Sequence, residues 1–307
     1  MFRSRRGVLA RLALLTTLVA LALSAAAQAA RPPSTYVAIG DSLAYGYQAA
    51  KFAAQFPNVD PTTFDTGYVD DYAQLLRFVR PNLEVVNEGC PSETSDSLIN
   101  GGPRPGFCAT GSGFPYPWLH HPYAASSQLA DALAVMAAKP NVTDVTIDIG
   151  ANDVLGFLRS CGFPSPRPGC LTPTSIGALY GHIAANMAAI VTQVRTAAPR
   201  AKVVILGLYN PYPATLPGGD GLTASLNTAL ASVAAGAGAA FADPLPVFNP
   251  ASRTGASETT DIPVICKFTG MCPGGTYNPT SPQADIHPTD LGYAALTGVI
   301  AAAALGF

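Results

Sequence analysis

The chain has 307 residues, of which 49% are hydrophobic and only 12% are charged. This length and composition suit one large α/β domain, or two smaller ones, with a substantial apolar core. The net charge of −2 argues against a nucleic-acid partner, because binding to phosphates requires clustered Lys and Arg, and no basic patch follows residue 31.

The first 29 residues have the pattern of an export signal. A basic start is followed by an apolar run that Arg11 interrupts, and Ala27-Gln28-Ala29 suits a small-residue cleavage site. An uncleaved membrane anchor is the alternative, which the cleavage site and Arg11 disfavour. Both the general and the twin-arginine export routes fit. We therefore expect a secreted, extracellular protein in which residues 30–307 form one domain, without stable membrane insertion after signal removal.

Apolar runs alternate with helical patterns along the mature chain. In chain order, we expect a strand over 36–39, a helix over 68–80, a strand over 83–87, a helix over 126–139, a strand over 144–149, a helix over 175–197, a strand over 202–208, a helix over 222–235, a strand over 239–242 and a final helix that begins at Pro288. This alternation predicts a parallel sheet with helices on both faces and right-handed crossovers.

The remaining segments are predicted loops, at 57–64, 100–122, 161–173, 210–219 and 244–283. Long loops in a compact domain usually line its functional site. Their aromatic side chains could form an apolar pocket for an acyl chain or simply pack the loops onto the domain, and the sequence favours neither. These side chains are Phe107, Phe114, Tyr116, Trp118, Tyr212, Phe248, Phe268 and Tyr277.

Six cysteines in an exported chain predict disulfides rather than free thiols. About 15 complete pairings are possible from sequence alone. Neighbouring cysteines enclose Gly- and Pro-rich stretches, so we expect sequential pairing in which each bridge fixes one loop. The expected pairs are Cys90 with Cys108, Cys161 with Cys170, and Cys266 with Cys272. We expect no metal site, because neither C-x-x-C nor H-E-x-x-H occurs, and no cofactor.

A serine stands where the first predicted strand ends, in Gly40-Asp41-Ser42-Leu43. Ligands bind α/β sheets at the carboxyl ends of their strands, so Ser42 is expected to be exposed to a substrate there. A serine hydroxyl is a poor nucleophile until a base takes its proton.

His287 is the best candidate for that base among the four histidines. Asp285 lies two residues before it, and a short turn can bring the carboxylate to Nδ1 of the imidazole, leaving Nε2 free for Ser42. His182 falls within a helical pattern and is expected to pack or to face solvent. His121, which also precedes a proline, is the weaker alternative, because no carboxylate stands close before it.

Ester cleavage also requires donors for a developing oxyanion. The candidates are the backbone N–H groups of Ser42 and Gly89 and the side-chain amide of Asn152. They follow the first, second and third predicted strands, so they should meet at one edge of a parallel sheet. Gly89 could merely allow a tight turn and Asn152 merely cap a helix, but their convergence with a serine and a histidine favours the donor role.

Four blocks of the sequence resemble the SGNH hydrolase superfamily of GDSL esterases and lipases, from about residue 35 to the C-terminus. The blocks are Gly40-Asp41-Ser42-Leu43, Asn87-Glu88-Gly89-Cys90, Gly150-Ala151-Asn152-Asp153 and Asp285-Ile286-His287-Pro288. The run 87–94 resembles secreted actinobacterial members, which also carry three disulfides. The nucleophile elbow G-x-S-x-G of the α/β-hydrolases does not occur.

This resemblance implies a role for each site residue. Ser42 would be the nucleophile, Gly89 and Asn152 oxyanion donors, and His287 the base oriented by Asp285. It also implies a flavodoxin-like three-layer α/β/α sandwich with a central parallel sheet of about five strands.

The leading functional hypothesis is a monomeric, secreted carboxylic-ester hydrolase that acts on lipid or short-chain acyl esters through a Ser-His-Asp triad. A carbohydrate esterase that removes acetyl groups from polysaccharide is the second. A catalytically inactive binding module on the same fold is the third, which the complete set of site residues disfavours. The apolar loop aromatics favour the first hypothesis over the second.

Overall fold

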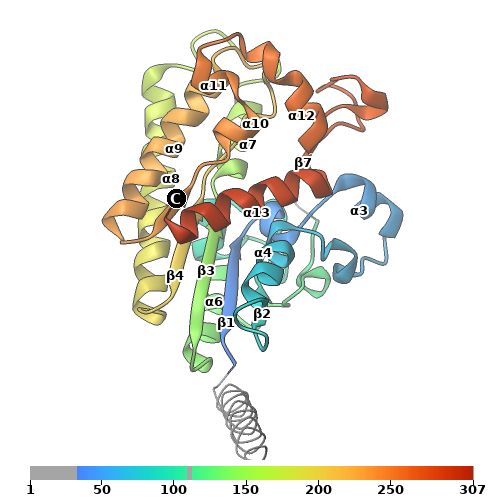
Figure 1. Cartoon of the computed structure of the whole chain (residues 1–307). Helices are drawn as coiled ribbons and strands as arrows, with labels where there is room; N and C mark the ends of the chain where they lie inside the picture. Colours follow the sequence, from blue (N-terminus) through green and yellow to red (C-terminus); the bar gives the residue numbers. More distant parts are fainter. Residues whose placement is uncertain (1–32, 109–112, 307) are drawn as a thin grey trace, which may run out of the picture.

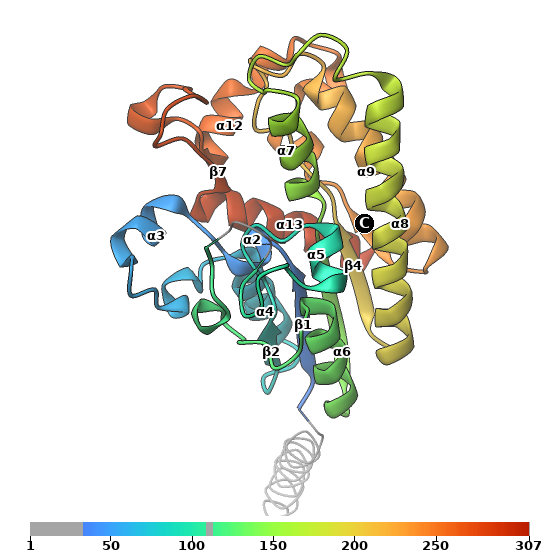
Figure 2. The same ribbon diagram turned by 180° about the vertical axis from the view of Figure 1, so that it is seen from behind.

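The computed structural model describes residues 33–108 and 113–306, so the export signal predicted for residues 1–29 lies outside the described residues. A five-stranded parallel sheet, in the order β2-β1-β3-β4-β5, runs through the protein. Its strands are β1 (Thr35–Gly40), β2 (Glu84–Asn87), β3 (Val142–Asp148), β4 (Lys202–Leu206) and β5 (Ala240–Ala242). Helices cover both faces (Figure 1, Figure 2). This flavodoxin-like strand order confirms the predicted α/β/α sandwich.

Side chains alternate between two apolar layers along the central strands, because successive residues of a strand point to opposite faces. In β1, Val37 and Ile39 belong to one layer, while Tyr36 and Ala38 belong to the other, and all four are fully buried. A parallel sheet that is covered on both faces requires such continuous apolar strands.

The helices predicted over 68–80, 126–139, 175–197 and 222–235 are all present. α6 (Gln128–Ala138), α8 (Pro173–Ala197) and α9 (Gly219–Gly236) contribute to the layer around Ile39, whereas α4 (Tyr68–Arg77) and α13 (Asp290–Leu305) contribute to the layer around Tyr36. Figure 1 shows α13 and α4 in front of the sheet, and Figure 2 shows α6 and α8 on its other side. Both core layers are therefore closed by helices.

The last helix begins differently from the prediction. Thr289 is the N-cap residue of α13, and its hydroxyl accepts a hydrogen bond from the backbone N–H of Gly292 at 3.2 Å. Pro288 instead ends β7 (Asp285–Pro288), which pairs in antiparallel fashion with β6 (Thr269–Gly270). A threonine hydroxyl can satisfy an open N–H of the first turn, which proline cannot, so the prediction that Pro288 begins the helix was wrong.

Several helices occupy segments that were predicted as loops or left unassigned. Most of them have only one or two turns, which carry too few residues for a periodic signal. Four flank the sheet edge: α2 (Ser42–Tyr45), α3 (Ala49–Gln55), α5 (Ser95–Asn100) and α7 (Ala151–Ser160). The predicted loop 244–283 contains α10 (Leu245–Phe248), α11 (Ala251–Thr254), η3 (Glu258–Asp261), α12 (Ile262–Phe268) and η4 (Pro273–Gly275). Two further 3₁₀ turns are η1 (Pro61–Phe64) and η2 (Tyr116–Trp118).

Three disulfides join neighbouring cysteines in sequential order. They are Cys90–Cys108, Cys161–Cys170 and Cys266–Cys272, with Cα–Cα distances of 5.6, 5.6 and 5.1 Å. The first fixes the segment after β2, the second closes the segment between α7 and α8, and the third ties α12 to the segment after β6. Each bridge therefore restrains a different connection near the carboxyl edge of the sheet.

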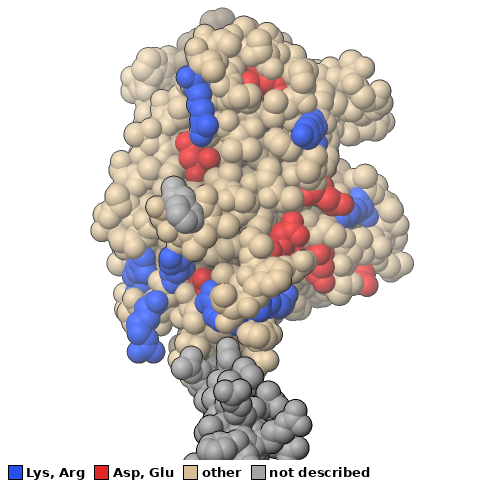
Figure 3. Space-filling model, viewed as in Figure 1, with Lys and Arg blue, Asp and Glu red and all other residues tan. Residues whose placement is uncertain are grey.

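Among the described helices, α8 alone is long and apolar enough to cross a membrane by length and composition. Core helices also meet that test, and a stripe of α8 that includes Ile183, Met187 and Ile190 is buried in the core. The face in Figure 3 is largely uncharged, and many of its Lys and Arg side chains lie toward the end where the strands begin, with others farther up the surface. This sparse surface charge agrees with the 12% of charged residues in the sequence.

Candidate active site

Ser42, His287 and Asp285 form a continuous chain of hydrogen bonds at the carboxyl edge of the sheet. Oγ of Ser42 lies 2.8 Å from Nε2 of His287, and Nδ1 of His287 lies 2.5 Å from Oδ1 of Asp285. Ser42 begins α2 directly after β1, while the other two residues belong to β7. Serine, imidazole and carboxylate in this order can transfer a proton away from the hydroxyl oxygen.

Backbone N–H groups and a neighbouring ring hold the acid and the imidazole. Asp285 accepts hydrogen bonds from Ala49 N at 2.7 Å and from His287 N at 3.1 Å. Burial alone raises the pKa of Asp285, but hydrogen bonds from His287 and Ala49 outweigh burial and hold the pKa below its usual value. The ring of Tyr47 lies edge-on to that of His287, with centroids 4.7 Å apart. An ionised carboxylate in this position orients the imidazole and stabilises its protonated form.

Buried polar side chains fix the backbone that leads into Ser42. Gln128 donates to Gly40 O at 2.8 Å and accepts from Gly40 N at 2.7 Å. Asp148, at the end of β3, accepts from Ala44 N at 3.2 Å and from the hydroxyl of Tyr68. A Cβ atom at Gly40 would lie 2.1 Å from Oδ1 of Asp148, so only glycine leaves room for this carboxyl group.

Asp41, the residue before Ser42, caps α2 by accepting a hydrogen bond from Leu43 N at 3.0 Å. Burial raises the pKa of Asp41 and of Asp148, and the charge of Asp41 raises the pKa of Asp148 further. Sequence reasoning missed Asp148, although a carboxylate near the carboxyl end of a predicted strand was a usable signal. Two acidic groups thus stand behind the serine without contributing to the His–Asp pair.

The three expected oxyanion donors lie near the sheet edge, but two of them are engaged within the protein. Gly89 N donates to Oδ1 of Asn87 at 2.9 Å. The amide of Asn152 donates to Glu93 O at 2.9 Å and to Oδ2 of Asp41 at 3.2 Å. Any anion bound by these two groups must therefore compete with acceptors of the protein itself.

Close packing explains the glycine that follows β2. A Cβ atom at Gly89 would lie 2.3 Å from the backbone nitrogen of Tyr45. Asn87 donates in addition to Ala44 O at 2.8 Å, which joins this turn to α2. The turn after β2 and the helix that begins with Ser42 therefore pack as one unit.

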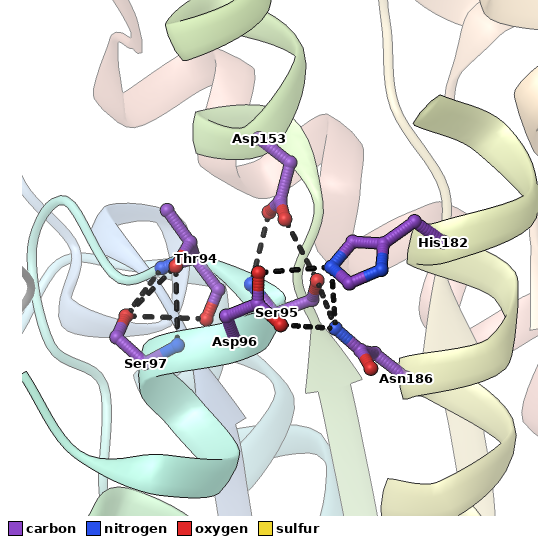
Figure 4. Close-up of polar contacts among 7 residues, drawn as sticks. All are labelled: Thr94, Ser95, Asp96, Ser97, Asp153, His182 and Asn186. Atoms are coloured by element: carbon purple, nitrogen blue, oxygen red, sulfur yellow. Dashed lines mark hydrogen bonds and ion pairs between the residues drawn. The ribbon is translucent and has the colours of Figure 1, made fainter. Parts of the chain in front are cut away.

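A polar cluster connects the start of α7 with α5 and α8 (Figure 4). Asp153 accepts from the backbone and the hydroxyl of Ser95, at 2.9 and 2.7 Å. Asn186 of α8 donates to the Ser95 hydroxyl and to Asp96, both at 3.0 Å, and Nε2 of His182 lies 2.8 Å from Asp96. Because Asn152 directly precedes Asp153, the cluster fixes its position relative to the segment that follows Gly89.

The other histidines lie away from Ser42 and have partners of their own. Their Nε2 atoms approach Tyr45 O at 3.0 Å (His120), Asp131 at 3.0 Å (His121) and Asp96 at 2.8 Å (His182). Asp131, the acid beside His121, follows the histidine in the sequence, so a search for an acid that precedes the histidine overlooked Asp131.

An apolar cavity opens beside Ser42 and His287. Aliphatic and aromatic side chains from α2, from α7, from β7 and from the segment after β4 line it, among them Leu43, Val154, Leu155, Leu158, Leu208, Tyr209, Tyr212, Leu216 and Ile286. A second hollow between α7, α8 and α9 shares Val154, Leu158, Leu208, Leu216 and Thr223 with it. The apolar wall therefore continues away from the serine between the helices.

Of the eight aromatic side chains predicted for a pocket or for loop packing, only Tyr212 lines this cavity. Phe114, Tyr116 and Trp118 belong to a cluster around the buried Tyr45. Phe248, Phe268 and Tyr277 pack in the layer closed by α13, and the guanidinium of Arg104 lies over Phe107. Loop packing is thus the main role of these aromatics, and much of the cavity wall comes from α7, which the sequence analysis did not predict.

The fold and this site place the protein among the serine ester hydrolases with a flavodoxin-like sheet. More narrowly, the GDSL-like lipase/acylhydrolase family model matches residues 38–295, and the chain belongs to that family. Among curated proteins, no sequence matches the chain.

Solved structures with this fold act on different esters. Phospholipase A1 from Streptomyces albidoflavus NA297 is 18% identical, with a TM-score of 0.51, and the match covers 88% of this chain and 98% of that one. An extracellular lipase from Streptomyces rimosus is 17% identical, with a TM-score of 0.54 and coverages of 88% and 99%. A variant of an acetyl xylan esterase from Geobacillus stearothermophilus is 16% identical, with a TM-score of 0.51 and coverages of 90% and 97%. At such identities the likeness shows the fold alone.

Proposed function

We propose that the mature chain, residues 30–307, is a secreted, monomeric carboxylic-ester hydrolase that acts on esters with apolar acyl chains, such as lipid esters. Ser42 is the nucleophile, His287 the general base and acid, and Asp285 the group that orients His287. The observation that carries the proposal is the apolar cavity that opens directly beside Ser42 and His287.

The first half of the reaction is transfer of the acyl group to Ser42. Nε2 of His287 takes the hydroxyl proton while Oγ attacks the acyl carbon, and a tetrahedral oxyanion forms. The protonated His287 then gives this proton to the leaving alcohol, and the ester bond breaks. Water, deprotonated by the same nitrogen, hydrolyses the acyl-enzyme and restores the Ser42 hydroxyl. The 2.8 Å contact between Oγ and Nε2 supports this assignment.

Stabilisation of the oxyanion is proposed for Ser42 N, Gly89 N and the amide of Asn152. Ser42 N has no hydrogen-bond partner among the described residues. Gly89 exchanges the amide oxygen of Asn87, and Asn152 the carbonyl oxygen of Glu93, for the oxyanion, which bears more charge than either of these neutral oxygens. The contact of Asn152 with Asp41 is kept. Hydrogen bonds to charged acceptors are the stronger ones, so this exchange favours the transition state over the free enzyme.

An acyl chain is proposed to lie along the wall formed by α7 and by the segment after β4. Burial of each methylene against such a wall contributes about 0.8 kcal/mol. Longer acyl esters should therefore be bound better than acetate esters, which could use only the polar mouth of the cavity. Acetyl xylan esterase activity, known for a protein of the same fold, is the alternative that a substrate panel decides.

Export is supported by the basic and apolar N-terminal pattern and by the three disulfides. A lipase of the same fold is likewise extracellular. Cleavage after Ala29 would release the ester hydrolase domain in soluble form.

The test is hydrolysis of p-nitrophenyl esters of rising chain length, with phospholipid and acetylated xylan alongside. For the wild type, we expect kcat/KM to rise from acetate to medium-chain esters. In Leu216→Trp, the larger side chain should fill part of the cavity, so kcat/KM should fall for long-chain esters. Leu75→Trp, at a position 45% exposed on α4, is the matched control and should behave as wild type. Preference for acetylated xylan, or an unchanged chain-length profile in Leu216→Trp, would contradict the proposal.

A further inference from the structure

A second cluster of ligating side chains lies behind the turn that carries Gly89. Glu88 is the first residue after β2, His121 lies in the segment before α6, and Asp131 belongs to the first turn of α6. One oxygen or nitrogen atom from each of the three lies within 4.8 Å of the other two. None of them lines the cavity beside Ser42, so the cluster is separate from the candidate active site.

The carboxylate of Glu88 is the feature that points to a ligand. The residue is 0% exposed, and neither of its carboxylate oxygens has a hydrogen-bond partner. Nε2 of His121 lies 3.8 Å from Oε1 of Glu88, which is too long for a hydrogen bond. Among the described residues, no Lys or Arg forms an ion pair with Glu88 or Asp131. A buried carboxyl group without a partner either keeps its proton or binds a compensating ion.

The other two side chains are already oriented toward the same point. Oδ1 of Asp131 accepts from Ala124 N and Ala125 N, at 2.7 and 2.8 Å, and Oδ2 lies 3.0 Å from Nε2 of His121. Hydrogen bonds of this kind to the outer oxygen of a ligand commonly fix metal ligands in place. The side chain of His121 is 37% exposed, which gives a cation a path from solvent.

The spacing and the donor types distinguish between cations. Ligands bonded to a tetrahedral Zn²⁺ at about 2.0–2.2 Å lie about 3.3–3.6 Å apart, and the observed separations of 3.0 and 3.8 Å from His121 bracket that range. Calcium and magnesium prefer sites built from oxygen alone, whereas an imidazole with two carboxylates suits zinc.

We propose that Glu88, His121 and Asp131 bind one Zn²⁺ ion, with water at the fourth position. The ion would link the residue before Gly89 to the segment that leads into α6. The hydroxyl of Tyr123 already donates to Glu88 O across the same junction. Zinc therefore acts as a structural clamp on this turn and takes no part in the ester chemistry.

The experiment uses the mature protein without a polyhistidine tag, stripped of metal and dialysed against ZnCl₂. Bound zinc is counted by mass spectrometry, and the melting temperature is followed in parallel. We expect one equivalent of zinc and a rise in Tm of about 5 °C or more at saturating zinc, with CaCl₂ and MgCl₂ producing neither effect. Absence of stoichiometric zinc binding would overturn the proposal.

Two variants locate the bound ion. Glu88→Gln and the half-exposed His121→Gln should each weaken zinc binding by about 100-fold or more, as removal of a direct ligand does. His182→Gln is the control, because His182 also pairs with an aspartate, at 2.8 Å, but lacks a third ligand. It should bind zinc as the wild type does. Zinc affinity that is undiminished in Glu88→Gln and His121→Gln would place the ion elsewhere and overturn the assignment.

Discussion

At the scale of single residues, the position of the Ser42 hydroxyl depends on groups that take no part in proton transfer. Gln128 holds the backbone of Gly40 on both its N–H and its C=O, and Asp148 holds Ala44. Asp41 caps the short helix that begins with Ser42. A nucleophile fixed from behind in this way loses little further freedom when a substrate binds, which is how pre-organised sites lower a barrier.

Asn152 provides the sharpest test of the oxyanion assignment. Asn152→Ala should lower kcat by about 10² to 10³ and leave KM nearly unchanged, because the donor acts mainly in the transition state. Steady-state kinetics on a medium-chain ester measures both constants. Asn152→Asp, which keeps the volume but loses the N–H donors, should be at least as impaired. A raised KM with an unaltered kcat would instead make Asn152 a substrate-binding residue.

The local sequence was sufficient to predict that Ser42, His287 and Asp285 meet, because Asp285 and His287 are neighbours and Ser42 follows a strand. It could not show that Gly89 N and the Asn152 amide are already paired inside the protein. The partner of Gly89 N is a side chain only two residues before it, and its orientation depends on how the turn after β2 packs on α2. The pairing of Asn152 with Glu93 O joins segments 59 residues apart and leaves no local pattern.

At the scale of elements, long periodic segments were predicted and short ones were not. The strands of the sheet read as apolar runs, and α4, α6, α8 and α9 show helical spacing over several turns. α7 was missed. This helix begins with Ala151, carries Asn152 and forms much of the cavity wall. Its polar first turn, which includes Asp153, breaks the apolar pattern on which the prediction relied. Missing α7 is also why the pocket was sought among loop aromatics.

The small sheet of β6 and β7 connects a disulfide to the active site. Cys266 and Cys272 flank β6, which pairs with the strand that carries Asp285 and His287. Replacing both cysteines with serine should lower the free energy of unfolding by about 2 kcal/mol in the chain-entropy model. It should also lower kcat at temperatures where the protein is still folded. Urea denaturation and activity assays measure the two effects.

The matched control replaces Cys161 and Cys170, whose bridge lies between α7 and α8 and does not border β7. Loss of that bridge should lower the free energy of unfolding by a similar amount. A fall in kcat as large as that of the Cys266 and Cys272 variant would refute a specific link between the third disulfide and the His–Asp pair.

At the scale of the whole molecule, buried carboxyl groups make stability depend on pH. Burial, aided by the Asp65 charge, raises the pKa of Asp70 to about 7, and burial raises that of Glu93 to about 7. Such groups keep their protons in the folded state between pH 4 and 7, where the unfolded chain releases them. The folded state then binds more protons, so the free energy of unfolding should fall as the pH rises through this interval.

Asp70→Asn tests this effect, because one carboxylate oxygen of Asp70 is buried without a hydrogen-bond partner. An uncharged amide avoids the cost of ionising a buried acid, so the variant should gain about 1–2 kcal/mol relative to wild type at pH 8 and nothing at pH 4. Denaturation curves at both values measure this. The control is Asp71→Asn, which replaces a more exposed neighbouring acid and should gain less free energy of unfolding at pH 8. Equal gains at pH 4 and pH 8 would show that ionisation is not the cause.

The identity of the nucleophile is the central claim, and covalent labelling tests it most directly. The folded protein is treated with a fluorophosphonate probe, and the adduct is counted by intact mass and located by peptide mapping. We expect one adduct per chain, on Ser42, with no labelling of Ser42→Ala and a loss of activity in that variant of about three orders of magnitude or more. An adduct on a different serine, or a Ser42→Ala variant that is still labelled and active, would contradict the account.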